Sequence, residues 1–134
     1  MAERRRGSVL IVASTASYQP VPYLATYGAT KAFDRMLAEA LAEEMKRHGV
    51  RVSALCPGPT ESEFVQVAGA RKGHPRKPQS AAEVARFGLE GLAEGKHWVI
   101  PYFAGRLAVF AQRFLPRRVV STAVERAFRP PSLQ

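Results

Sequence analysis

The chain contains one cysteine, no asparagine and no long apolar segment. The single cysteine, Cys56, excludes an internal disulfide bond and suits a reducing compartment. No stretch approaches the roughly 18 apolar residues that a membrane-spanning helix needs. The first residues are rich in arginine, and the apolar run that follows them, Val9 to Ala13, is too short for the core of a signal peptide. These absences favour a cytoplasmic protein.

Acidic residues are scarce relative to basic ones, and the formal net charge is +9 at pH 7. Much of the excess lies near the end of the chain, at Arg106, Arg113, Arg117, Arg118, Arg126 and Arg129. No nucleic-acid-reading motif accompanies these arginines, so we expect no nucleic-acid partner. The charge is explained either by a solvated surface or by attraction to phosphate groups or an anionic membrane. The histidines are isolated from one another, so we expect no metal site.

At 134 residues, of which 46 % are apolar, the chain can form one domain with its own core. Short apolar runs are typical of buried strands, and periodic apolar spacing is typical of helices. The expected elements are strands at 8–13, 50–56 and 97–100, helices at 23–48 and 80–94, a loop at 14–22 and a long loop at 60–80. Gly49 is expected to end the first helix, and Ser80 with Glu83 three residues later forms a capping box that is expected to start the second. Strands that alternate with helices predict a parallel α/β sheet with right-handed crossovers.

Three strands make a small sheet, and at least one apolar edge would stay unpaired. We therefore expect residues 1–104 to form the C-terminal half of a Rossmann-like, doubly wound parallel sheet. Residues 105–134 are expected to form a basic, amphipathic helical tail that Pro116 interrupts. The first apolar stripe of this tail includes Leu107, Phe110 and Phe114.

Three side chains near the first strand can handle a carbonyl group and a proton. Tyr27 and Lys31 are four residues apart on the expected helix, so they share one face. A neighbouring ammonium favours the phenolate, which makes a tyrosine a better general acid or base. Ser14 follows the first strand, at the edge of a parallel sheet where ligands bind, and could orient the same substrate oxygen.

These residues, taken with the segment after the second strand, resemble the short-chain dehydrogenase/reductase family over about residues 7–100. The resemblance rests on Val-Leu-Ile-Val-Ala-Ser at 9–14, Tyr-Gly-Ala-Thr-Lys-Ala at 27–32 and Cys-Pro-Gly-Pro-Thr at 56–60. It implies an oxidoreductase that uses NAD or NADP to interconvert a small-molecule carbonyl and an alcohol. The segment 60–80 would then be the lid over the substrate.

The resemblance also implies a role for each matching residue. Tyr27 would be the proton donor and acceptor at the substrate oxygen, and Ser14 would hold that oxygen. Lys31 would assist Tyr27 and bind the ribose next to the nicotinamide, and Tyr27 would also contact the cofactor. Pro57 and Gly58 would let the backbone pass close to the nicotinamide, with Thr60 near its carboxamide or the phosphates. The cofactor itself would carry the hydride.

Several features of the family are missing from this chain. It has no Thr-Gly-x-x-x-Gly-x-Gly loop to hold a pyrophosphate. It also lacks the acidic or basic residue that, at the end of the family's second strand, selects NAD or NADP. The family's catalytic asparagine is also absent. We therefore expect the chain to be truncated at its N-terminus and to be inactive on its own.

Two other functions are considered besides that of an enzyme: assembly with a second copy of the chain and binding to a membrane. The chain could be a non-catalytic remnant that forms a homo-oligomer through the helix at 23–48, with Met36, Ala40 and Met45 facing a second copy. It could also contact a membrane peripherally through its basic tail. Small residues that would allow a backbone or a flat ligand to approach this helix closely are Ala25, Gly28, Ala29 and Ala32.

Overall fold

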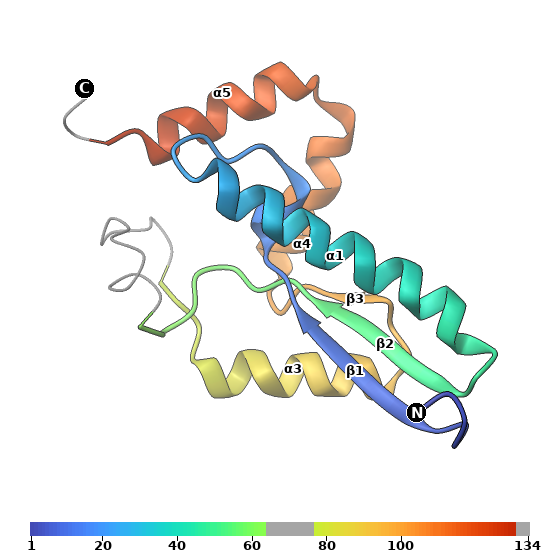
Figure 1. Ribbon diagram of the computed structural model, residues 1–134. Helices are drawn as coiled ribbons and strands as arrows, with labels where there is room; N and C mark the ends of the chain where they lie inside the picture. Colours follow the sequence, from blue (N-terminus) through green and yellow to red (C-terminus); the bar gives the residue numbers. More distant parts are fainter. Residues whose placement is uncertain (64–76, 131–134) are drawn as a thin grey trace.

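The computed structural model describes residues 1–63 and 77–130, and these form a parallel sheet with helices on both faces (Figure 1). The strands are β1 (Gly7–Val12), β2 (Val50–Leu55) and β3 (Trp98–Val99). They lie in the order β1–β2–β3, and both pairings are parallel. The expected α/β class and the three expected strands are confirmed, and β1 is an edge strand of this sheet.

Two helices enclose the sheet and create a core on each of its faces. Helix α1 (Ala25–Lys46) lies on one face and helix α3 (Ala81–Ala93) on the other (Figure 1). Ala54 packs with Ala38 of α1 in the larger core cluster. The next residue of β2, Leu55, packs with Val84 of α3 in a second cluster. Because successive strand residues point to opposite faces, one continuous apolar run supplies both cores.

Helix α1 begins later than the expected start at residue 23. Tyr23 has a φ angle of +66°, a left-handed conformation that is costly for a residue with a side chain. Leu24, at the N-cap, makes no side-chain capping hydrogen bond. Pro22 therefore lies in the preceding loop and not in the first helical turn. At the other end, Gly49 has a φ angle of +64° and stops the helical segment, as expected.

The capping signal at the start of α3 is confirmed. The hydroxyl of Ser80 accepts a hydrogen bond from the backbone N–H of Glu83 at 3.2 Å. This bond satisfies a donor that the first turn of a helix leaves without an intrahelical partner. The spacing of serine and glutamate therefore located the start of this helix correctly.

The tail after β3 is helical. It consists of α4 (Phe103–Ala111), a short 3-10 turn η2 (Gln112–Phe114) and α5 (Arg117–Phe128), with the interruption at Pro116 as expected. The boundary that we predict between residues 104 and 105 falls in the first turn of α4, and the division into two units stays a prediction. Within residues 1–63 and 77–130, every helix is too short or too polar to cross a bilayer.

Helix α5 is joined to the loop before α1 by a cluster of three polar side chains. The hydroxyl of Tyr23 donates a hydrogen bond to Glu125, and Arg129 donates two, at 2.9 and 2.8 Å. The bonds from Arg129 and then from Tyr23 hold the pKa of the Glu125 carboxyl at about 2, well below its ordinary value. Glu125 therefore stays ionised at neutral pH and links the two segments.

Replacing Glu125 with glutamine is expected to loosen α5, because a neutral amide accepts weaker hydrogen bonds than a carboxylate. Amide hydrogen exchange of α5 should become faster, whereas exchange in α1 should stay unchanged. In the native chain the pKa of Glu125 is lower in the folded state than in the unfolded state. The hydrogen bonds to Glu125 therefore stabilise the fold fully above the unfolded pKa, and this stabilisation is lost as the pH falls through about 2.

A matched control is Glu90→Gln on α3. Glu90 accepts a hydrogen bond from Arg86 within the same helix, so its loss breaks no link between elements. If amide hydrogen exchange in α5 is equally fast in the native chain and in Glu125→Gln, the polar cluster around Glu125 does not hold the helix in place.

Candidate active site

The candidate site lies where the chain leaves β1 and β2, at the carboxyl edge of the sheet. The backbone carbonyl of Pro57 accepts hydrogen bonds from the N–H of Thr15 at 2.9 Å and from its hydroxyl at 3.3 Å. The N–H of Ala13 donates to the carbonyl of Leu55 at 2.8 Å. These bonds extend the pairing of the two strands into the segments that follow them. They bring the loop after Ser14 against the Pro57–Thr60 segment.

Ser14 is buried and caps a short 3-10 turn, η1 (Thr15–Tyr18), which the expected loop did not include. Its hydroxyl oxygen accepts from the N–H of Ala16 at 3.1 Å. The hydroxyl donates to the carbonyl of Pro57 over 3.5 Å, a long and therefore weak hydrogen bond. Ser14 thus has a fixed position, while its proton is only weakly engaged.

Lys31 reaches from α1 to the end of β1. Its ammonium donates to the backbone carbonyl of Val12 at 2.8 Å and pairs with Asp34 at 3.0 Å. Its side chain is 24 % exposed, so solvent screens this pair only in part. An ammonium has three N–H donors, and two of them are used by these partners. Lys31 therefore both anchors the helix and keeps one donor for a ligand.

Tyr27 is half-buried and lies one helical turn before Lys31, on the same face of α1. Because Lys31 contacts Val12, this face of the helix is turned toward the end of β1, where Ser14 follows. The structure thus places all three predicted catalytic residues at one edge of the sheet. Their catalytic roles stay predictions.

Gly58, which we expected to lie close to a nicotinamide, packs against the aromatic ring of Tyr102. A side chain at Gly58 would place its Cβ 2.6 Å from the ring of Tyr102, so a larger residue would force this ring to shift. Gly105, in the first part of α4, also lies against the ring, and a Cβ built there would be 2.4 Å from it. Thr60 donates from its hydroxyl to the carbonyl of Gly58 at 3.1 Å, and its backbone pairs with Gln79. Most of the predicted substrate lid, residues 64–76, lies outside the described residues.

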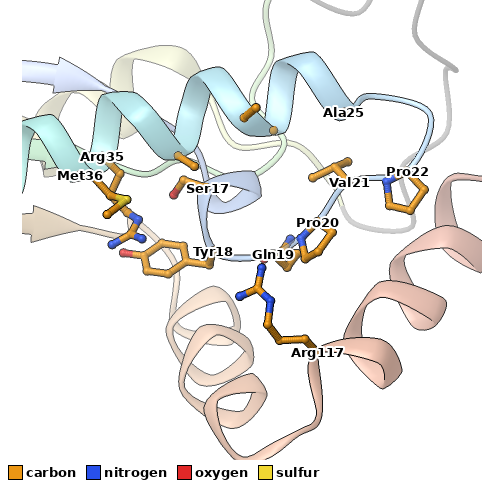
Figure 2. Close-up of a pocket in the computed structure, with 13 residues that line it drawn as sticks. Ser17, Tyr18, Gln19, Pro20, Val21, Pro22, Ala25, Arg35, Met36 and Arg117 are labelled. Atoms are coloured by element: carbon orange, nitrogen blue, oxygen red, sulfur yellow. The ribbon is translucent and has the colours of Figure 1, made fainter.

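A cavity of about 510 Å³ lies on a different face of α1 (Figure 2). Its lining includes the patch of small residues that the sequence indicated, at Ala25, Gly28, Ala29 and Ala32. Figure 2 shows Arg117 reaching into this cavity from the start of α5, and Arg35 beside Tyr18. Neither this cavity nor a second one of about 520 Å³ is lined by the three predicted catalytic residues. The predicted catalytic residues therefore lie outside these two cavities.

Cys56 is fully buried in the larger core cluster, as expected for a small apolar residue. The hydroxyl of Tyr18 donates to its sulfur at 3.9 Å, and the guanidinium of Arg35 lies 4.4 Å from the centre of the tyrosine ring. Burial raises the pKa of the Cys56 thiol and also raises the pKa of Tyr18. Both groups stay protonated at neutral pH, so this pair is structural and not a nucleophile.

Two residues of the site were not anticipated from the sequence. Asp34 lies three residues after Lys31, a spacing that places side chains side by side on a helix, so the sequence held a usable signal for this ion pair. Thr15, which fastens the two loops through Pro57, had no such signal, because its partner is 42 residues away in the chain.

Known proteins resemble this chain in sequence. The family model for short chain dehydrogenases matches residues 1–73. The very-long-chain 3-oxoacyl-CoA reductase of Pyrenophora tritici-repentis is 33 % identical over 121 residues, covering 88 % of this chain and 36 % of that protein. Dehydrogenase/reductase SDR family member 4 of Sus scrofa is 34 % identical over 88 residues, covering 66 % and 32 %. The chain thus spans about a third of the length of these relatives.

Solved structures share the fold. A short-chain dehydrogenase from Sphingobium yanoikuyae in complex with NADPH has a TM-score of 0.71 at 23 % identity, covering 98 % of this chain and 51 % of that one. A 7beta-hydroxysteroid dehydrogenase has a TM-score of 0.77 at 22 % identity, covering 92 % and 49 %. This chain spans about half of each, and the likeness confirms the Rossmann-like fold. With the family model matching more than half of its residues, the chain belongs to the short-chain dehydrogenase family.

Proposed function

We propose that this chain supplies the acid–base part of an NAD(P)-dependent oxidoreductase that interconverts a carbonyl and an alcohol. The observation that carries the proposal is the hydrogen bond from Lys31 to the carbonyl of Val12. It turns the face of α1 that bears Tyr27 toward the end of β1, next to Ser14. The carboxyl ends of parallel strands are where α/β folds bind their ligands.

In this proposal each side chain has a separate task. Tyr27 donates a proton to the substrate oxygen during reduction and accepts it back during oxidation. The ammonium of Lys31, on the same helix face, stabilises the phenolate that remains. Ser14 donates a hydrogen bond to the substrate oxygen, and its weak 3.5 Å bond to the carbonyl of Pro57 costs little to exchange.

The residues present fit one end of the cofactor. The remaining N–H donor of Lys31 can bind a ribose hydroxyl. The chain has no glycine-rich loop to surround a pyrophosphate, and phosphate binding in this kind of fold depends on such a loop. When bound, the cofactor supplies the hydride; two related structures contain NADPH and NADP. We therefore propose that residues outside this chain hold the pyrophosphate and that the chain alone is inactive.

The test is a carbonyl-reduction assay on the chain extended by the sequence encoded upstream of Met1, with a panel of ketones and NADH or NADPH. In that protein, Lys31→Met should lower kcat/KM by about 10²-fold, because it removes a charge that stabilises the reacting phenolate. The rate is measured by loss of nicotinamide absorbance. Absence of reduction by the unchanged extended chain, across the panel, would contradict the proposal.

Lys31 also anchors α1, so the test needs a control that separates folding from chemistry. Asp34→Asn removes the partner of the ammonium but leaves the charge of Lys31 in place. We expect this variant to keep kcat/KM within about tenfold of the unchanged enzyme, since partly exposed ion pairs contribute little. An equal loss in both variants, with equally reduced thermal stability, would assign Lys31 to folding alone.

A second candidate function is homo-oligomerisation through α1. The side chains of Phe33 and Met36 are 64 % and 63 % exposed, and Leu37 next to them is 39 % exposed. Ala40 is also exposed, whereas Met45 packs against the larger core cluster and cannot face a partner. An apolar patch on a helix of this kind is typical of an interface.

Replacing both Phe33 and Met36 with serine is therefore expected to shift the protein toward monomer. Light scattering coupled to size-exclusion chromatography would measure the mass. A matched control is Leu89→Ser on α3, where the side chain is 59 % exposed but lies on the other face of the sheet. A monomer in the unchanged protein would contradict this candidate.

A further inference from the structure

The first tail helix presents its apolar side chains to solvent. Phe103, Leu107, Phe110 and Phe114 are 77, 56, 57 and 74 % exposed, and together we call them the apolar strip. Their spacing of four, three and four residues places them along one side of α4 and η2. The buried residue Gly105 lies on the opposite side of the helix. The strip therefore points away from the domain.

The strip is continuous and extends into α5. The rings of Phe110 and Phe114 pack edge to face with their centres 5.3 Å apart. Leu115 and Val119, on either side of Pro116, are 49 % and 51 % exposed. These exposures describe an apolar surface along the tail, of which Phe110 and Leu115 also line the second cavity. An extended row of exposed apolar side chains is typical of a surface that contacts another macromolecule or a membrane.

Positive charge accompanies the apolar strip. Arg113 and Arg118 are exposed beside its end, whereas Arg117 reaches into the cavity next to α1 (Figure 2). Between residues 95 and 130 the acidic residues are limited to Glu125, and its carboxylate is already paired with Arg129. An exposed apolar strip with arginines at its border is the arrangement of helices that lie in the interface of an anionic membrane.

We propose that the apolar strip docks on an anionic lipid surface, with its phenylalanines among the acyl chains and Arg113 and Arg118 at the lipid phosphates. The charge distribution favours this occupant over a second copy of the chain. Two copies joined symmetrically through the strip would bring their arginines together and would repel each other. The strip contains none of the proposed acid–base residues, and the proposal does not depend on the oxidoreductase activity.

The test is flotation of the full 134-residue chain with vesicles of phosphatidylcholine, with and without phosphatidylglycerol. We expect flotation with the anionic vesicles and little with the neutral ones. Binding to the anionic vesicles should fall in salt of about 1 M, where the screening length is about 3 Å. Flotation that is equal with both vesicle types would overturn the electrostatic part of the proposal.

Two pairs of matched variants test whether the apolar strip is the surface that binds the vesicles. Phe110→Ser with Phe114→Ser should weaken vesicle binding about tenfold or more, since each phenylalanine loses apolar contact with lipid. Phe33→Ser with Met36→Ser removes comparably exposed apolar residues from α1 and should leave binding unchanged. Arg113→Gln with Arg118→Gln should weaken anionic-vesicle binding, whereas Arg4→Gln with Arg6→Gln, at the other end of the chain, should have a smaller effect.

Circular dichroism of each variant checks its folding, and light scattering checks its mass. The proposal is overturned if the Phe110 and Phe114 changes leave vesicle binding intact. It is equally overturned if they convert a dimer to a monomer with no change in flotation, because the strip is then an interface between two copies. Loss of binding in the strip variants alone, at unchanged mass, supports it.

Discussion

Replacing Tyr27 with phenylalanine in the proposed oxidoreductase should lower kcat by about 10²–10⁴-fold, the usual contribution of a general acid or base. Phenylalanine keeps the ring and removes only the hydroxyl, so α1 should fold as before. Binding of NAD(P)H, measured by fluorescence, should be little changed, because the proposed bond to the ribose comes from Lys31.

Tyr23→Phe is the matched control for this change. Tyr23 lies in the loop before α1, and its hydroxyl binds Glu125 of the tail. Its loss should loosen α5 but should alter kcat by less than about tenfold, since the residue has no proposed part in proton transfer. Full activity in Tyr27→Phe would remove the tyrosine from the mechanism and with it the central step of the proposed function.

The second large effect is expected for the chain alone. Without a loop that surrounds the pyrophosphate, the 134 residues should show no saturable binding of NADH or NADPH in the micromolar range. Calorimetric titration would measure this, with the chain extended upstream of Met1 as the positive control. Each tenfold difference in affinity corresponds to about 1.4 kcal/mol, so loss of several phosphate contacts should be easily detected.

Saturable micromolar binding to the 134-residue chain would refute this prediction. It would also show that the Pro57–Thr60 segment and Lys31 hold more of the cofactor than one end. That result would not affect the other part of the proposed function, proton transfer by Tyr27. The prediction for Tyr27→Phe and the prediction for cofactor binding can therefore be tested independently.

The sequence predicted the sheet and both enclosing helices, because these depend on local patterns. The continuous apolar run at 50–56 identified a strand buried on both faces, and Ser80 with Glu83 identified the start of α3. The four-residue spacing of Tyr27 and Lys31 was sufficient to place both side chains on one helix face.

Features that depend on distant contacts could not be read in this way. The start of α1 is displaced because Tyr23 adopts a left-handed conformation, which no local pattern indicates for a tyrosine. The expected reason for Gly58 was an approaching ligand, whereas the residue that needs the space is Tyr102, far away in the sequence. The exposure of Phe103 and Phe114 could not be predicted either. An amphipathic pattern shows that a helix has an apolar face, but not whether the rest of the protein covers that face.

The ring of Tyr102 lies against both Gly58, beside the candidate site, and Gly105, in the helix that carries the apolar strip. If a ligand at one of these places displaced the ring, it would also change the surroundings of the other. A lipid surface that altered the affinity for a cofactor in this way would, by reciprocity, find its own affinity altered by the cofactor by the same factor.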